Sequence, residues 1–247
     1  MERPDLVATR HRTAASERVA YAVRDLGVAA DVTERVVERF PSGAPARSEL
    51  LSRRAKVALV LWSETGRPTW GWSLRRGKKH GLELEWHEGG RIAFAEPWVR
   101  GLAHGTARQW NDRGELLVAY AMDRGSGVEL WCDARTGRLA EETTLVRGRL
   151  HGVRRWWSGD DRTIHAEEHF REGEPHGIER RWDDARRLRR GWLRYFSRGV
   201  RVSAREYAVR AAEDGTLPVR RAIDDEPSRA LPPAYVASRR LLRARSE

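Results

Sequence analysis

Short segments in which apolar residues alternate with polar ones recur from residue 57 to about residue 200. This period of two is typical of half-buried β-strands. Residues 82–87, Leu-Glu-Leu-Glu-Trp-His, show it most clearly, whereas residues 57–62 are all apolar and predict a buried strand. The pattern therefore predicts a mainly β chain.

Two kinds of predicted strand alternate along this stretch. One kind follows a His-Gly pair, and the other leads back from a polar or glycine-bearing turn and is richer in β-branched and aromatic residues. The return strands are predicted at residues 92–99, 116–122, 139–146, 163–170 and 188–196. Each pair is one predicted β-hairpin, and about six hairpins in succession predict an elongated, single-layer antiparallel meander.

A five-residue motif, with glycine at both ends and histidine in fourth place, marks the start of the hairpins. It first appears as Gly77-Lys78-Lys79-His80-Gly81, and a shortened copy stands at residues 124–127. The second glycines fall at 81, 105, 127, 152 and 177, so the steps are 24, 22, 25 and 25 residues. A regular period of this length is the signature of a repeat array. The repeated corner residues are Gly77, His80, Gly81, Gly101, His104, Gly105, Gly148, His151, Gly152, Gly173, His176 and Gly177.

The residue types at the corners have a physical reason. Glycine adopts a positive φ without steric cost, so a glycine at each corner allows the same tight reversal in every repeat. A histidine that recurs at one repeat position is expected to order its corner by bonding nearby backbone. A shared metal site is not expected, because histidines one repeat apart are separated by two strands, about 10 Å, which is too far for one ion.

A tryptophan follows each second glycine four or five residues later. Strand alternation predicts that these indoles form a ladder along one sheet face, about 10 Å apart. Two interpretations stay open: the indoles are the sheet's own packing layer, or they and nearby arginines are also the surface that binds a partner. The candidate partner face consists of Trp86, Trp110, Trp131, Trp157, Trp182, Arg108, Arg155 and Arg180.

The residues before the array predict a helical cap. Apolar positions recur at helical spacing in residues 16–27, a capping-box pattern opens a second predicted helix at 31–40, and a third helical stretch is expected at 48–56. Residues 41–47 are interpreted as a linker. The expected domains are 1–56, a helical cap and linker; 57–210, the repeat array; and 211–247, a linker and an arginine-rich tail.

Charge and composition narrow the function without deciding it. The net charge is +11, but only Lys56, Lys78 and Lys79 of the 47 basic residues are lysines, and acidic residues are interspersed among the arginines. The lone cysteine, Cys132, fits a reducing compartment. No apolar stretch is long enough to span a bilayer and no signal peptide is recognised, so a cytoplasmic protein is expected.

No residue pattern for catalysis or cofactor binding is recognised. The sequence lacks a nucleophile elbow, a phosphate-binding loop and a zinc-binding helix motif. Adjacent carboxylates such as Glu141 and Glu142 point to opposite faces of a strand, so they make a poor acid–base pair. Cys132 is expected to be a small, partly buried side chain. We therefore expect no enzyme activity, no cofactor and no bound metal.

These motifs resemble the MORN repeat (membrane occupation and recognition nexus), and more closely its bacterial variant form. The resemblance rests on the glycine-histidine corner, the aromatic residue that follows it and the next glycine turn, over residues 62–200. The chain departs from the family in using tryptophan where tyrosine or phenylalanine is frequent, and in a third repeat that lacks the histidine. The resemblance implies a hairpin array used for binding: some bacterial variants are antitoxin components that accompany a toxin, and some eukaryotic members are membrane-associated scaffolds.

Together these observations predict a non-enzymatic scaffold for protein–protein binding. An antitoxin or immunity-like protein that neutralises a toxin is one form that such a scaffold takes. The alternative is association with anionic membrane lipid or nucleic acid through arginine. Binding to anions should weaken steeply with salt, whereas a protein interface with an aromatic core should persist.

Overall fold

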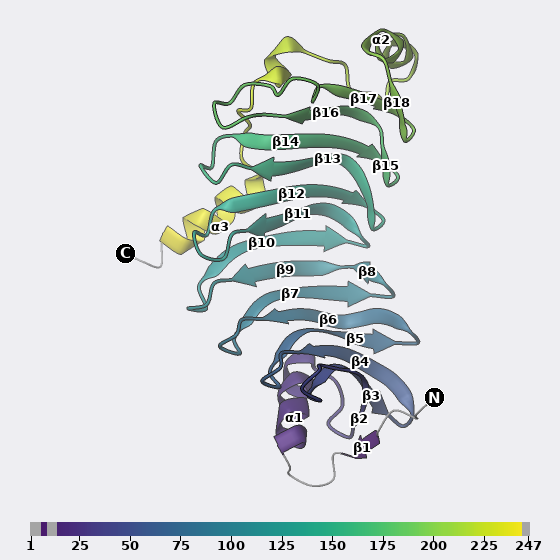
Figure 1. The fold of residues 1–247 in the computed structure, drawn as a ribbon, viewed down its shortest axis with the longest axis vertical. Helices are drawn as coiled ribbons and strands as arrows, with labels where there is room; N and C mark the ends of the chain where they lie inside the picture. The colour runs from purple at the N-terminus through teal and green to yellow at the C-terminus, as the bar shows by residue number, and fades with distance from the viewer. Residues whose placement is uncertain (1–5, 9–13, 244–247) are drawn as a thin grey trace. The chain divides into compact units, whose positions relative to one another are not determined.

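The computed structural model describes residues 6–8 and 14–243, and within them the chain is mainly β-strand with three α-helices. The chain folds as two compact units, one ending at Glu115 and the other beginning at Leu116. In each unit, antiparallel hairpin follows hairpin as a meander (Figure 1). The prediction of an antiparallel hairpin array with a short helical cap near its N-terminus is therefore confirmed.

In the described residues of the N-terminal unit there are one helix and a meander of paired strands. Its elements are β1 (Leu6–Ala8), α1 (Ala14–Leu26), β2 (Thr33–Arg39), β3 (Pro45–Ser52), β4 (Ala55–Trp62), β5 (Pro68–Arg75), β6 (Lys78–Trp86), β7 (Ile92–Val99), β8 (Leu102–Ala103) and β9 (Gly105–Trp110). The short strands β8 and β9, which His104 separates, both pair with β7 and act as one interrupted strand. Because β2 to β5 pair in sequence, the strand array begins well before residue 57.

Only the first of the three predicted N-terminal helices forms. The second and third are wrong, because those residues form β2, β3 and β4, and the predicted linker at 41–47 is the turn between β2 and β3 and the start of β3. Residues four apart share a face in a strand as well as in a helix, so the spacing of Val32 and Val36 fits either structure. Strand pairing decides between them: Val36 stands opposite Ser48. The carboxylate of Glu34, predicted to cap a helix, is buried and accepts a hydrogen bond from Ser48 Oγ (2.6 Å).

The C-terminal unit repeats the meander and ends in a largely helical segment. Its elements are β10 (Leu116–Asp123), β11 (Ser126–Cys132), β12 (Leu139–Val146), β13 (Arg149–Trp157), β14 (Ile164–Arg171), β15 (Glu174–Pro175), β16 (Gly177–Arg181), β17 (Arg194–Ser197), β18 (Val200–Val202), α2 (Ala204–Glu213), the 3-10 helix η1 (Ala222–Asp225) and α3 (Pro233–Arg243). β15 and β16, separated by His176, both pair with β14, as β8 and β9 do with β7.

Strand alternation gives the sheet of each unit two different faces. In β6, Leu82, Leu84 and Trp86 belong to the face on which α1 packs, whereas Glu83 and Glu85 point to the other face. We call the face on which a unit's own helices pack its covered face, and the other its open face.

The core of the N-terminal unit lies between α1 and the covered face. One side of α1 buries Val19, Ala22, Val23 and Leu26, which recur at the helical period. The strands contribute Leu50, Ala58, Val60, Trp62, Leu84 and Trp86. Each large apolar side chain buried there stabilises the unit by about 1.5–3 kcal/mol relative to its exposed form. The helix therefore supplies the second layer that a single sheet lacks.

In the C-terminal unit, residues after β18 cover one face of the sheet. The segment between η1 and α3 runs beside Thr163, the residue before β14, with which Ser228 forms an antiparallel bridge. α3 then packs on β10, where Ser238 Oγ accepts a hydrogen bond from the Ala119 amide (3.0 Å). Parts of the segment predicted as a linker and tail, Ser228 and α3 among them, are therefore packed against the sheet.

Candidate binding surfaces

The glycine-bearing corners are two-residue turns in which both central residues have a positive φ. At one of them φ is +53° for Arg100 and +87° for Gly101, which are the values of a type I′ turn. The same sign pair occurs at Arg76-Gly77, Arg124-Gly125, Arg147-Gly148, Glu172-Gly173 and Arg198-Gly199. The predicted role of these first glycines is therefore confirmed.

Successive corners within a unit are hydrogen-bonded to one another. The Gly101 amide donates to the carbonyl oxygen of Lys79 (2.8 Å), and the Arg100 amide donates to Nδ1 of His80 (3.4 Å). Matching backbone bonds run from Gly148 to Gly125, from Gly173 to Leu150 and from Gly199 to Pro175. Each corner is thus tied to the preceding one about 10 Å away, two strands back along the edge.

Two of the four motif histidines, His80 and His176, accept the second of these bonds, as predicted. His176 Nδ1 accepts a hydrogen bond from the Arg198 amide (3.1 Å), in the same way as His80 does from its neighbouring corner. In the shortened third repeat, Ser126 Oγ accepts the equivalent bond from the Arg147 amide (3.0 Å). A hydroxyl therefore replaces the imidazole as the acceptor, and the loss of one histidine leaves the corner intact.

Three of the predicted partner-face indoles are buried on the covered face of their unit. Trp86 Nε1 donates to Asp25 of α1 (2.9 Å), and Trp182 Nε1 donates to the carbonyl oxygen of Asp225 (2.6 Å). Trp157 is buried as well. For these residues the partner-face prediction is wrong, because the chain's own helical segments already cover the sheet. The packing interpretation of the ladder holds here.

Trp131 does not belong to the ladder. It follows Gly127 by four residues instead of five, so strand alternation places it on the open face, where it is 38% exposed. Cys132 takes the ladder position, fully buried, and burial raises the pKa of its thiol to about 12. The thiol is therefore a neutral, buried side chain at neutral pH and not an activated nucleophile.

Cys132, which is smaller than the tryptophan at the same position of the other repeats, lies in the region where α3 packs. Tyr235 of α3 is buried and donates a hydrogen bond to Asp161 Oδ1 (3.0 Å). Gly137, in the turn between β11 and β12, lies against Leu117 and Arg239 of the same unit. Where the indole is missing from the ladder, a helix of the chain contributes a tyrosine instead.

The other predicted members of the partner face divide into two pairs. Arg108 is exposed and Trp110 half-buried in β9, at positions that belong to the covered face but lie beyond α1. Arg155 and Arg180, in contrast, lie among buried charges on the covered face of the C-terminal unit. The structure therefore leaves Arg108 and Trp110 accessible but removes Arg155 and Arg180 from any partner surface.

The buried charges form a row across β12, β13, β14 and β16. Glu142, Arg155, Glu167 and Arg180 are successive cross-strand partners. Glu167, 3% exposed, accepts hydrogen bonds from Arg155 Nε (2.8 Å) and Arg180 Nη1 (3.2 Å). Arg229, from the segment that crosses this face, donates to both carboxylate oxygens of Glu167 at 3.1 Å. The row is a paired structural network that holds the crossing segment down.

The arginines also decide the charge state of Glu167. Burial alone would raise the pKa of its carboxyl, but the hydrogen bonds and positive charges of Arg229 and Arg155 outweigh burial and lower the pKa to about 2. A pocket of about 440 Å³ opens beside this row. Its other charged groups are paired too, since Arg221 forms two hydrogen bonds with Asp224 at 2.9 Å. The pocket therefore offers a ligand no free charge.

The open face of the C-terminal unit carries a second set of tryptophans, of which Trp131 alone was predicted as a partner-face residue. Trp131 and Trp156 flank Glu141 in one cross-strand row. The guanidinium of Arg154 lies 4.5 Å from the Trp156 ring centroid, and its Nε donates to Glu141 (2.9 Å). Indole, arginine and carboxylate thus form one surface cluster.

A second cluster lies further along this open face. Arg181 and Arg194 approach the same indole, Trp192, with their guanidinium carbons 4.1 and 3.8 Å from its ring centroid. Arg181 pairs with Glu168 (3.4 Å) and Arg194 with Glu179 (3.6 Å). Three arginines therefore face three glutamates over the two clusters, so these clusters have aromatic and guanidinium surface without surplus charge.

The open face of the N-terminal unit has a related arrangement. Lys79 Nζ lies 5.2 Å from the Trp72 ring centroid and 4.4 Å from that of Trp98, and it pairs with Glu83 (2.6 Å). Trp70 Nε1 donates to the same carboxylate (2.9 Å). Three indoles therefore surround one ion pair on a face that also exposes part of each ring.

The packing contacts of the described helices all fall on covered faces. α1 packs on the strands that carry Trp62 and Trp86, and α2 packs through Tyr207 on Tyr195, which is paired with Ile178 of β16. Apart from Trp131, the open-face indoles were not predicted, because only one repeat position was followed along the sequence. Adjacent Trp156 and Trp157 were a usable signal, since neighbours in a strand must face opposite ways.

Comparison with models of known protein families and with curated protein sequences found no match for this chain. Among the described residues, none of the helices has the length and apolar character needed to cross a membrane. Within the same residues, no group of His, Cys, Asp and Glu side chains is placed to hold a metal ion. The MORN resemblance therefore rests on the motifs quoted above.

Proposed function

We propose that this chain is a non-enzymatic repeat scaffold that binds a protein partner through its open face. One observation carries the proposal: the covered-face indoles are mostly buried by the chain's own helices, whereas those of the open face remain partly exposed beside arginines. Tryptophan and arginine are the residue types most enriched at the energetic centres of protein interfaces. The open face thus has the composition of an interface and no described helix upon it.

The charge balance of the open face favours a protein over a polyanion. Arg154, Arg181 and Arg194 already pair with glutamates, so the face presents planar, amphipathic groups and little net charge. Interfaces between proteins bury such groups at their centre, with polar contacts around them. A polyanion would need unpaired positive charge instead.

The resemblance to bacterial variant MORN repeats extends the proposal to one class of partner. Some proteins with such repeats are antitoxin components, and an antitoxin that covers a toxin needs a broad binding surface and no chemistry of its own. We therefore propose a toxin, in a cytoplasmic setting, as the first partner to test. The natural candidate is the protein encoded beside this chain's gene.

Replacing Trp131 or Trp156 by alanine is expected to weaken the complex by about 2 kcal/mol, or about 30-fold in Kd, because each change removes an aromatic contact at the centre of the open face. The measurement is isothermal titration calorimetry of the purified chain with the purified neighbouring protein at moderate salt. Arg135→Ala, in an exposed turn of the same unit, is the matched control and should leave Kd unchanged.

Two outcomes would overturn the proposal. One is a complex whose Kd does not change in either tryptophan variant while both variants keep the wild-type melting temperature. The other is the absence of a complex with the neighbouring protein together with salt-sensitive binding of lipid or nucleic acid, which would favour the arginine-mediated alternative.

A further inference from the structure

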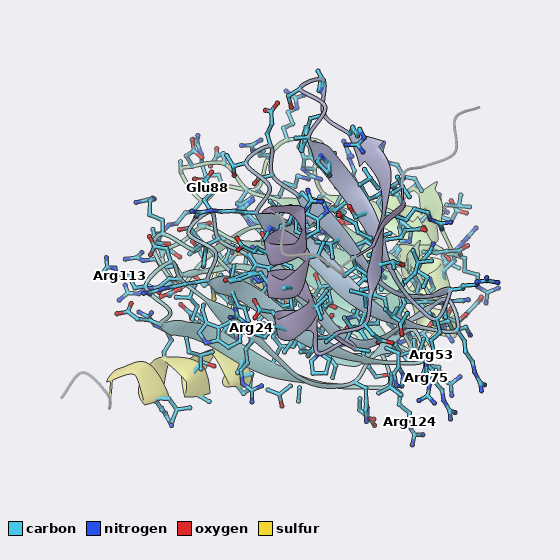
Figure 2. All side chains as sticks on the ribbon, turned by 90° about the horizontal axis from the view of Figure 1, so that it is seen from below. Arg24, Arg53, Arg75, Glu88, Arg113 and Arg124 are labelled. Carbon is cyan, nitrogen blue, oxygen red and sulfur yellow. The ribbon has the colours of Figure 1, made fainter. Side chains whose placement is uncertain are left out.

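One edge of the N-terminal unit is strongly basic. The corners that join β3 to β4, β5 to β6 and β7 to β8 lie along this edge and carry no acidic residue. Their basic residues are Arg53, Arg54, Arg75, Arg76, Lys78 and Arg100. The turns of the opposite edge mix both signs, with Glu88 and Arg113 as examples, and Figure 2 shows these two residues across the unit from Arg53 and Arg75.

The arginines stand where the backbone disfavours them. Arg53, Arg54, Arg76 and Arg100 have φ of +47°, +68°, +52° and +53°, in the left-handed region. At such turn positions glycine, asparagine and aspartate are preferred, because a long L side chain is disfavoured there. Arginine therefore does not serve the turn, and its recurrence at successive corners points to a use for the side chain.

The side chains of these six basic residues are also available to bind a ligand. All six residues are exposed, and none of them forms an ion pair with another described residue. Several other basic residues of this unit, such as Lys79 with Glu83 and Arg35 with Glu49, are paired with carboxylates in contrast. Six basic side chains without a carboxylate partner among the described residues are thus gathered on this edge.

The spacing of the charges is set by the sheet. Corners on one edge recur every second strand, so the charged positions repeat at about 10 Å. The corner-to-corner hydrogen bond from Gly101 to Lys79 holds two of these turns in register. The result is a narrow, one-dimensional row of guanidinium groups on a rigid edge.

We propose that this row, called the corner edge, binds the sugar-phosphate backbone of a nucleic acid. Arginine is suited to it because its planar guanidinium can donate two parallel hydrogen bonds to one phosphate. A row one or two side chains wide matches a linear polyanion, whereas a membrane surface is met best by charges spread in two dimensions. The corner edge is separate from the open face, so the two proposals stand or fall independently.

Substitution by asparagine separates binding from folding. Asparagine is preferred at a positive φ, so Arg76→Asn and Arg100→Asn should keep the melting temperature or raise it while removing two charges. The test uses the full chain with a fluorescently labelled 20-base-pair DNA duplex of arbitrary sequence, and records anisotropy at several salt concentrations. Three phosphate contacts would weaken wild-type binding about 40-fold between 50 and 200 mM salt.

The double variant R76N/R100N is expected to reduce the slope of log K against log salt by about two. The matched control, R113N/R135N, removes two charges from exposed turns that do not belong to the corner edge and should leave the slope unchanged. Equal losses in both double variants would overturn the proposal, as would no duplex binding at 50 mM salt. Vesicles with a quarter phosphatidylserine serve as the second arm, and binding to them but not to the duplex would overturn it too.

Discussion

Replacing Glu167 by glutamine is expected to lower the free energy of unfolding of the C-terminal unit by about 3–5 kcal/mol at neutral pH. The substitution keeps the shape of the side chain but leaves the buried guanidinium groups of Arg155 and Arg180, and that of Arg229 beside them, without their shared carboxylate. An unbalanced buried charge is far more costly than an absent pair. Urea unfolding followed by tryptophan fluorescence measures the change.

The pH dependence of this difference has a definite sign. The folded-state pKa of Glu167 is about 2, below its ordinary value of 4.5, so the carboxylate contributes stability above pH 4.5. That contribution, about 3 kcal/mol for a shift of this size, is lost as pH falls from 4.5 towards 2. The stability gap between wild type and Glu167→Gln should therefore narrow over this range and stay constant from pH 5 to 8.

The neighbouring residue provides the control for this experiment. Glu168 points to the open face, where it pairs with the partly exposed Arg181. Glu168→Gln should therefore cost at most about 1 kcal/mol, as for exposed ion pairs. Equal effects of the two substitutions would contradict the buried network, and so would a gap for Glu167→Gln that does not change down to pH 2.

Gly177→Ala is expected to destabilise the C-terminal unit by at least about 3 kcal/mol, the sum of backbone strain and overlap. Gly177 has φ of +137°, which L-residues rarely adopt, and a Cβ there would lie 2.5 Å from the Cβ of His169 and 3.0 Å from Pro218. Both neighbours are held by packing, so the overlap has no easy relief. Thermal and urea unfolding measure the loss.

A substitution at another glycine of the same unit separates the cost of backbone strain from the cost of steric overlap. Gly159 has φ of +75°, and a Cβ there would meet no atom within 4 Å. Gly159→Ala should therefore cost only about 1 kcal/mol, the usual penalty for an L-residue in the left-handed region. If both glycine variants unfold at the same urea concentration, the close approach of β14 and β16 at Gly177 is wrong.

Most of what could be predicted of the fold from the sequence came from the repeat motif. The corner motif, with glycine at both ends and histidine in fourth place, recurs at a regular period. Such a pattern leaves few alternatives to a hairpin meander. The N-terminal strands β2 and β3 could not be derived in the same way, because they lack the corner motif and Val32 and Val36 fit either structure. Their structure depends on β2 pairing with β3 and on β3 pairing with β4, which is information that no local window contains.

The candidate surface was harder to predict than the fold. A tryptophan at a repeat position is equally suited to packing and to binding, and the choice depends on what covers it. The covering segments, α1 and residues 204–243, lie outside the repeat and follow no repeat pattern. Trp131 shows the limit of the motif: one residue fewer after Gly127 moves the indole to the other face, although the sequence spacing looks nearly unchanged.

The corner-to-corner bonds have a consequence for how such a chain can change in evolution. Because each corner bonds the one before it, as Gly173 does with Leu150 and Gly199 with Pro175, inserting or deleting one hairpin leaves the remaining bonds with equivalent partners. Duplication of a segment of about 25 residues would lengthen both faces and any basic edge together. The helices that cover the sheet have no such freedom, since each packs on particular side chains, as α1 does on Trp62 and Trp86 and α2 on Tyr195. New length is therefore most readily accommodated between the covered regions.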